Sequence, residues 1–353
     1  MKRIVLIFAV CMFLIPGCRP SVQEYPQVIR VNGGQFHVQG IAFDKESRCL
    51  YSSFTDTFLK SDLEGNLIGS ITGINGHLGA MTYDSRNRKV YASLELKDDN
   101  IGKNISHALG AEAFSREQSR FYVAEIDVDK VTGPDTPLDE AVTLHEITEA
   151  GKDYLAKVNI DGKELDHRYG CSGIDGVAIA PEFGKARSRN RYLYVAYGVY
   201  GDTTRIDNDY NILLCYDLKN LKTPVKKYFV HTGNTTYGVQ NMTYDEFTER
   251  LYLAVYKGKK AENPNYTLFA LDINQQPFTD ILTGVPYHEG KTDQLSTCGG
   301  WHFKWGSTGI NSLGDGYYYI SENGKENGIQ YCNATLYMAS DSVETPFTRP
   351  ENE

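Results

Sequence analysis

The chain has 353 residues, of which 41% are hydrophobic and 23% are charged, so it is long enough to bury the core of one large domain or of two average ones. Its formal net charge is −9. An acidic protein of this kind is not expected to bind nucleic acid, or an anionic membrane surface, through charge.

The first eighteen residues, MKRIVLIFAVCMFLIPGC, combine a basic start, an apolar run from Ile4 to Ile15 and a small-residue exit. The apolar run is too short to span a ~30 Å hydrocarbon layer as a helix. The pattern resembles the bacterial lipoprotein signal, in which a small residue precedes the lipidated cysteine. We therefore expect a signal peptide over residues 1–17, lipidation of Cys18 and a tether over residues 18–27. The alternative is a plain secretory signal in which Cys18 has no role.

A lipidated Cys18 predicts a protein of the bacterial cell envelope, periplasmic or surface-facing, that contacts the membrane only through its lipid anchor. Five cysteines remain beyond this segment, so at least one of them is expected to be free. No two of them have CxxC spacing, which argues against zinc-ribbon and thioredoxin-like chemistry.

Two octapeptides, HVQGIAFD at 37–44 and HLGAMTYD at 77–84, begin with histidine and end with aspartate. Five related starts are each followed by a polar turn and a second β-branched or aromatic run, which is typical of a β-hairpin. A third and a fourth run complete each unit, and the fourth runs are LIGSITG, VTLHEIT, KKYFVHT, FTDILTG and the tail around Pro346. The repeat predicts an all-β fold, a β-propeller of five four-stranded blades, with six blades as the alternative.

The strand VIRV at 28–31 precedes the first repeat and is expected to pair with the last blade and close the ring. Residues 28–353 are thus predicted to form a single propeller domain. The second unit is lengthened by two insertions, of which the first is predicted to be helical near residues 104–120 and the second surrounds Tyr154 to Tyr169.

The GIAFD-type starts and the aspartate turns resemble the superfamily of strictosidine synthase-like, gluconolactonase-like and NHL-repeat propellers. In the gluconolactonase-like and paraoxonase-like enzymes, carboxylate and asparagine side chains at the central ends of blades hold a calcium ion. The resemblance implies that Asp175 in GIDGVAIAP and Asn241 in VQNMTYD are the matching residues. The glutamate that those enzymes carry near the first blade is absent, and His37 and Gln39 stand there instead.

The innermost strands of all blades begin at one end of the central channel, so the residues just before them converge there. Alignment of the unit starts places His37 and His77 at one position, where the third and fourth units have glycine. The segment CGGWHFKW aligns with the start of the last blade. The other side chains expected at this mouth are Gln39, Asp175, Gln240, Asn241, Trp301, His302 and Lys304.

These residue types fit more than one chemistry. The three histidines His37, His77 and His302 are candidate ligands for a divalent metal (zinc, calcium or another) that activates water. Without a metal, one neutral histidine is a candidate general base, with Lys304 stabilising developing negative charge. The structural alternative is that the histidines cap strands or line a solvated channel.

We therefore expect an exported, lipid-anchored propeller that binds a small molecule or a glycan at the channel mouth. The first alternative is a hydrolase or lyase, and the second is a non-catalytic protein-interaction scaffold. The catalytic candidates are His37, His77, Asp175, His302 and Lys304. The candidates for ligand binding are Gln39, Gln240, Asn241 and Trp301.

Overall fold

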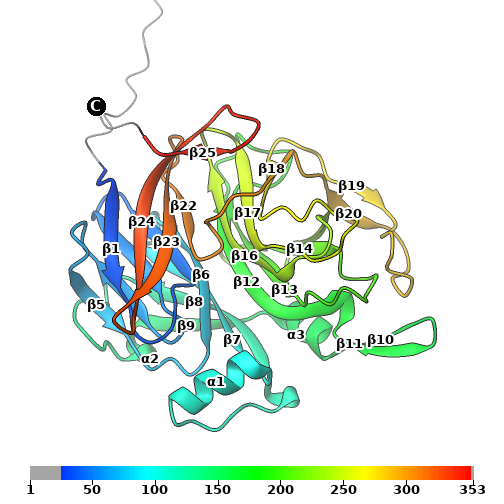
Figure 1. Cartoon of the computed structure of the whole chain (residues 1–353), viewed down its shortest axis with the longest axis horizontal. Helices are drawn as coiled ribbons and strands as arrows, with labels where there is room; N and C mark the ends of the chain where they lie inside the picture. The colour runs from blue at the N-terminus through cyan, green and yellow to red at the C-terminus, as the bar shows by residue number, and fades with distance from the viewer. Residues whose placement is uncertain (1–24, 351–353) are drawn as a thin grey trace, which may run out of the picture.

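The computed structural model describes residues 25–350, so the predicted signal peptide and Cys18 lie outside the described residues. Within this range no helix is long and apolar enough to cross a membrane. Five sheets, each built on four antiparallel strands and two of them extended by further strands, form the blades of a β-propeller (Figure 1), which confirms the predicted all-β fold and the count of five blades. Each innermost strand contacts the innermost strands of both neighbouring blades, and these strands surround the central channel.

The blades follow one another in chain order. Blade 1 consists of β2 (Gly40–Asp44), β3 (Cys49–Ser53), β4 (Phe58–Ser61) and β5 (Leu67–Ile71). Blade 2 consists of β6 (His77–Asp84), β7 (Lys89–Leu96), β8 (Arg120–Asp127) and β9 (Val142–Glu146). Blade 3 begins with β12 (Cys171–Ala180), β13 (Tyr192–Val199), β14 (Tyr210–Asp217) and β15 (Lys226–His231).

Blade 4 consists of β16 (Thr236–Asp245), β17 (Arg250–Tyr256), β18 (Leu268–Asp272) and β21 (Gly299–Trp301). Blade 5 consists of β22 (Ile310–Ser312), β23 (Tyr317–Glu326), β24 (Ile329–Ala339) and β1 (Val28–Asn32). The short β25 (Phe347–Thr348) also pairs with the end of β24.

The first strand of the chain closes the ring, as predicted. β1 pairs antiparallel with β24, with Val28 opposite Thr335 and Asn32 opposite Tyr331. Figure 1 shows β1 beside β24 and β23, so the start and the end of the domain share one sheet. This pairing covers the outer edge of β24, which would otherwise expose unpaired backbone groups.

The prediction for the fourth strand of blade 4 was wrong. The segment FTDILTG contributes β19 (Phe278–Asp280), which pairs with β20 (Thr292–Leu295) and extends blade 3, because β20 runs parallel to β15. The strand that completes blade 4 is β21, from CGGW. Its glycines weaken the strand signal in the sequence, whereas its backbone pairing with β18 decides the structure.

The two insertions of blade 2 carry most of the helical structure. α1 (Asn100–Ala108) begins where the side chain of Asp99 accepts a hydrogen bond from Gly102 N, and it overlaps the first part of the predicted range of 104–120. The other helical and hairpin elements are η2 (Arg116–Gln118), α2 (Leu138–Ala141), α3 (Thr148–Leu155), η3 (Arg168–Gly170) and the hairpin of β10 (Lys157–Ile160) and β11 (Lys163–Asp166).

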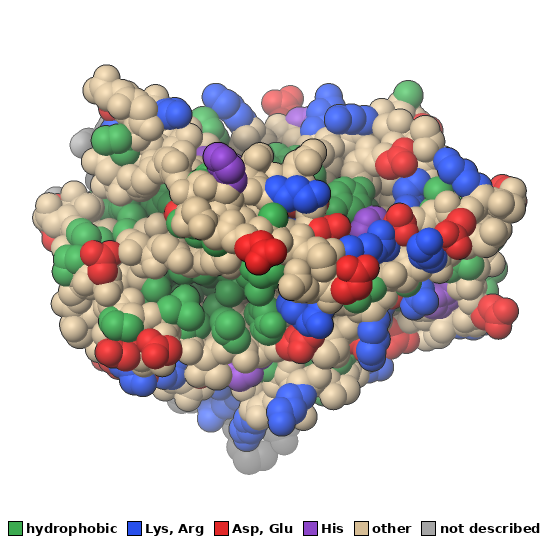
Figure 2. Space-filling view, turned by 90° about the horizontal axis from the view of Figure 1, so that it is seen from below, with side chains coloured by type: hydrophobic (Ala, Val, Ile, Leu, Met, Phe, Trp, Pro, Cys, Tyr) green, Lys and Arg blue, Asp and Glu red, His purple; other side chains and the backbone are tan. Residues whose placement is uncertain are grey.

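Hydrophobic clusters fill the spaces between neighbouring blades, because each sheet presents apolar side chains on both faces. Cys49, Cys171, Cys215 and Cys332 are buried and Cys298 is exposed, and all five are free thiols. Figure 2 shows Lys, Arg, Asp and Glu side chains interspersed around a hydrophobic area, with neither charge sign covering the described residues on that face.

Candidate functional site

The candidate site lies at the channel mouth where the innermost strands begin. His77 is the first residue of β6, and in the hairpin of blade 2 it stands opposite Glu95 near the end of β7. Asp175 belongs to β12, the innermost strand of the next blade. The hairpin register thus brings an imidazole and a carboxylate of one blade against a carboxylate of its neighbour.

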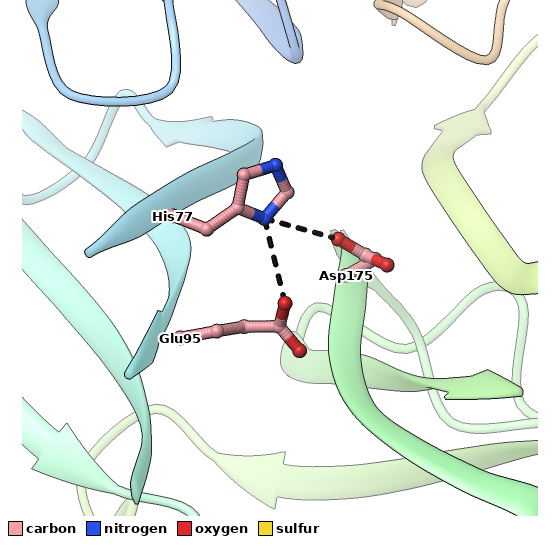
Figure 3. A group of neighbouring side chains, drawn as sticks. All are labelled: His77, Glu95 and Asp175. Atoms are coloured by element: carbon pink, nitrogen blue, oxygen red, sulfur yellow. Dashed lines mark ion pairs between the residues drawn. The ribbon is translucent and has the colours of Figure 1, made fainter. Parts of the chain in front are cut away.

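The three side chains form a compact buried group. His77 Nδ1 lies 3.4 Å from Glu95 Oε2 and 3.9 Å from Asp175 Oδ1. The Glu95 side chain is 1% exposed, and the side chains of His77 and Asp175 are each 10% exposed. Figure 3 shows Nδ1 turned toward both carboxylates and the other ring nitrogen, Nε2, turned away from them. The imidazole therefore presents Nδ1 to the two acids and Nε2 to the opposite side.

Lys97 adds a positive charge to the group. Its Nζ lies 2.6 Å from Glu95 Oε2 and 3.4 Å from Asp99 Oδ2, and it donates a hydrogen bond of 3.3 Å to the backbone carbonyl of Ser172. Burial alone would lower the pKa of Lys97, but Glu95, Asp99 and Asp175 raise it above its ordinary value. Lys97 is consequently a permanent cation at the floor of the mouth.

Asp175 has the opposite electrostatic environment. Burial raises its pKa well above the ordinary value, and the charge of Glu95 raises it further, while Lys97 and a hydrogen bond from Gln240 oppose the shift. Gln240 Nε2 donates to Asp175 Oδ2 at 3.0 Å and to the carbonyl of Tyr237 at 2.8 Å. The carboxyl of Asp175 thus binds a proton more readily than an exposed aspartate does.

Glycine residues make room for these carboxylates. Gly173 has φ +120°, and a Cβ built there would lie 2.0 Å from Glu95 Oε1 and 2.4 Å from the ring of Phe121. The same carboxylate oxygen accepts a hydrogen bond of 2.8 Å from the backbone N–H of Ile174. Gly173 stands at the position of the third unit where the first two units have histidine. The carboxylate of Glu95, which belongs to blade 2, lies against this glycine.

His37 lies beside a cavity at the same mouth. The cavity has a volume of about 520 Å³, and its lining includes His37, Tyr256, Lys304, Trp305 and Asn323. Burial lowers the pKa of His37, and the charge of His77 lowers it further. The cavity has room for a small molecule, and it is lined by His37 but not by His77, Glu95 or Asp175.

Gln39 fixes the state of His37. The amide Nε2 of Gln39 lies 3.0 Å from His37 Nε2 and donates a bond of 3.2 Å to Thr55 Oγ1. An amide nitrogen only donates, so it holds the Nε2 atom of His37 as an acceptor in the neutral imidazole.

The structure brings most of the predicted site residues to this mouth. Gln240 reaches Asp175, and Asn241 donates its amide N–H groups to the carbonyls of Gln39 and Ser307, at 2.8 and 2.9 Å. Asn241, in blade 4, therefore binds the segments that lead into blades 1 and 5. Its amide nitrogen is used in these bonds, and it is not among the residues close enough together to share a metal ion.

The placement of CGGWHFKW at the start of the last blade was wrong. Trp301 ends β21, the outer strand of blade 4, and the following His302 is exposed and packs against the ring of Tyr266 at 5.1 Å. The predicted metal ligand set of His37, His77 and His302 is therefore not brought together. Lys304 does reach the cavity, because the chain returns toward the channel before β22 begins.

Sequence reasoning missed three members of the group, Glu95, Lys97 and Asp99. They lie where the second strand of blade 2 ends, in the segment ELKDD. In a hairpin the end of the second strand returns to the start of the first, so a charged run there belongs to the same mouth as His77. This antiparallel register is the signal that could have identified them.

By distance alone, two kinds of chemistry are open to the group. One ligand atom each from His77, Glu95 and Asp175 lie within 4.8 Å of one another, close enough to hold one metal ion. Alternatively, the carboxylates hold the imidazole as a general base.

No family model matches the chain, and no curated protein matches it. Among solved structures the chain is similar to the hydrazine synthase of Kuenenia stuttgartiensis, with 10% identity and a TM-score of 0.41, over 80% of this chain and 61% of that chain. The chain thus spans less than two thirds of that protein. It is also similar to XC5397 from Xanthomonas campestris, described as a gluconolactonase, with 10% identity and a TM-score of 0.33, over 86% and 88% of the two chains. Both TM-scores are below 0.5, so the fold assignment rests on the five sheets and neither likeness bears on activity.

Proposed function

We propose that the protein is a small-molecule hydrolase in which His77 is the general base. The observation that carries the proposal is the orientation of the imidazole, with Nδ1 toward Glu95 and Asp175 and Nε2 away from them (Figure 3). A carboxylate beside Nδ1 favours the tautomer with its proton on Nδ1, and Nε2 then carries the lone pair that accepts a proton.

The proposed reaction is hydrolysis of an ester or lactone. His77 Nε2 takes a proton from water, and the water oxygen forms a bond to the substrate carbonyl carbon. The carbon–oxygen bond to the leaving alcohol then breaks, and the imidazolium returns the proton to that oxygen. Glu95 stabilises the transient imidazolium, since its carboxylate is buried 3.4 Å from Nδ1.

The cavity of about 520 Å³ supplies the substrate site. Lys304 lies on its wall with Nζ 4.2 Å from the centre of the Trp305 ring, where a cation can stabilise a developing oxyanion. Tyr256 and Trp305 offer aromatic surfaces for an apolar part of the substrate.

Hydrolysis of p-nitrophenyl acetate and of dihydrocoumarin, an aromatic lactone, tests the proposal. We expect the wild-type protein to hydrolyse at least one of them, and His77→Gln to lower kcat/KM by about 10²- to 10⁴-fold, as expected for loss of a general base. His302→Gln is the matched control, because His302 lies outside this group, and it should leave the rate unchanged. Equal rates for wild type and His77→Gln would refute the role of His77.

The second candidate function is non-catalytic binding of a small molecule or glycan in the same cavity. The aromatic rings of Tyr256 and Trp305 on the cavity wall favour it. Under this alternative, His77→Gln still binds the ligand, as measured by quenching of tryptophan fluorescence. Trp305→Ala no longer binds it, as measured by calorimetry.

The proposed cellular location rests on the N-terminal sequence alone. We propose that Cys18 is lipidated and holds the propeller at the bacterial envelope. Metabolic labelling with a palmitate analogue should mark the wild-type chain and leave Cys18→Ala unlabelled.

A further inference from the structure

The surroundings of the Lys97 ammonium resemble a cation site built for a metal. Within 3.5 Å its Nζ has two carboxylate oxygens, from Glu95 and Asp99, and the backbone carbonyl of Ser172. Carboxylate and carbonyl oxygens of this kind are the ligands that hard divalent cations prefer in proteins. The Lys97 side chain is only 5% exposed, so the cation is part of the floor and not a solvated surface group.

Lys97 contacts an oxygen atom of Glu95, which is one of the three candidate metal ligands. Glu95 Oε2 lies 2.6 Å from Lys97 Nζ, and Glu95 is one of the three residues, with His77 and Asp175, that lie close enough together to hold an ion. An ion bonded to this oxygen would lie within about 5 Å of the ammonium, given metal–oxygen bonds of about 2.0–2.6 Å. The two positive charges would repel each other strongly in a buried site.

We propose that Lys97 is the resident cation of this mouth, and that it excludes the divalent metal that the resemblance to calcium-dependent propeller enzymes implies. The metal does not fit the group as the chain has it, because the position next to Glu95 already holds an ammonium. Lys97 orients the carboxylates of Glu95 and Asp99 and balances part of their charge without an ion. This inference concerns cation binding and does not depend on the proposed hydrolase activity.

The other charged groups around the ammonium support the assignment. Glu95 Oε1 is used by the backbone N–H of Ile174, which leaves Oε2 as the oxygen for a cation. Asp99 caps α1 through Gly102 N and also lies 3.5 Å from the hydroxyl of Tyr200. A fixed side-chain cation therefore ties the α1 insertion to the floor of the mouth.

Direct metal binding tests the proposal. Wild type, Lys97→Met and Lys97→Gln are freed of metal with a chelator, and Mn²⁺ binding is measured by electron paramagnetic resonance and calorimetry. We expect the affinity for one Mn²⁺ ion to be at least about 100-fold higher in both variants than in wild type, because the repelling charge is removed. Adding Glu95→Gln to Lys97→Met should abolish the gain.

Lys260→Met is the matched control. Lys260 is another lysine with a side chain 5% exposed, paired with the single carboxylate of Asp209 at 2.6 Å, and its removal should produce no tight Mn²⁺ site. Circular dichroism establishes which variants are folded. Binding of Mn²⁺ by wild type as tightly as by the variants would overturn the proposal, and this result needs no folded variant. A folded Lys97→Met or Lys97→Gln without a gain in affinity would overturn it as well. Because the readout is ion binding, failure here is distinct from failure of the hydrolase assay.

Discussion

The innermost strands carry polar residues at both ends of the channel, yet the two mouths are built differently. At the end of the strands, Asp44, Asp84 and Asp245 each accept hydrogen bonds from backbone N–H groups of the turn that follows. At the start, His77 and Asp175 face Glu95 from a neighbouring strand or blade instead of a local turn. The aspartates that recur in several blades thus fix the hairpins, whereas His77, Glu95 and Asp175 form one buried charged group.

The difference shows which part of the octapeptides is architecture. The closing aspartates have the same local role in several blades, so the fold explains them. His77 has no such role, and its Nδ1 makes no hydrogen bond of normal geometry among the described residues. A buried group that local structure does not require is the better candidate for function.

The largest expected effect comes from breaking the buried group. Glu95→Ala leaves Lys97 buried with one carboxylate fewer, and we expect the free energy of unfolding to fall by about 3–5 kcal/mol. Urea denaturation followed by circular dichroism measures the change. A loss below about 1 kcal/mol, the value of an exposed pair, would show that the group is solvated and not buried.

Replacing Gly173 tests the close packing around Glu95. Gly173→Ala places a Cβ 2.0 Å from Glu95 Oε1 at φ +120°, and we expect a loss of about 1–3 kcal/mol from backbone strain alone, together with displacement of the carboxylate. Gly290→Ala is the control, because Gly290 also has positive φ but no atom within 4 Å of its Cβ. Equal losses in the two variants would mean that Glu95 does not restrict position 173.

The opposite mouth should respond less. Asp84→Ala removes bonds to Arg86 N, at 3.0 Å, and Asn87 Nδ2, at 2.7 Å. We expect a loss of about 1–2 kcal/mol of unfolding free energy. Hydrolysis, measured with the same esters as for His77→Gln, should be unchanged. A large loss of activity in a folded Asp84→Ala variant would mean that the active site lies where the innermost strands end and not where they begin.

The smallest effect is a pH dependence of stability. The folded pKa of His37 lies below its ordinary value of 6.5, because of burial and then the charge of His77. Folding therefore favours neutral His37, and its contribution is present above pH 6.5 and lost as the pH falls through the lowered folded pKa. The difference in unfolding free energy between wild type and His37→Gln should shrink between pH 7.5 and pH 5. A difference that grows over this range would contradict the account.

The fold was more predictable than the site. Local hairpin patterns and aspartate turns are short-range signals, so the five blades and the closure by β1 could be predicted. The position of β21 could not, because Gly299 and Gly300 carry no strand preference and only tertiary pairing places them. His77 and Asp175 could be predicted from their position before the innermost strands. Glu95 and Lys97 required the hairpin register, in which a bulge lies between Leu78 and Met81.

The tautomer of the His77 ring shows whether its Nε2 atom can act as the base. Nitrogen-15 NMR of the wild-type protein, with the His77 signals assigned by comparison with His77→Gln, reports which ring nitrogen carries the proton. We expect that at pH 7.5 the proton is on Nδ1, which faces Glu95 and Asp175, and that Nε2 is free to accept a proton. A proton on Nε2 with a bare Nδ1 would contradict it, because His77 could not then act as the base from the side that faces away from the carboxylates.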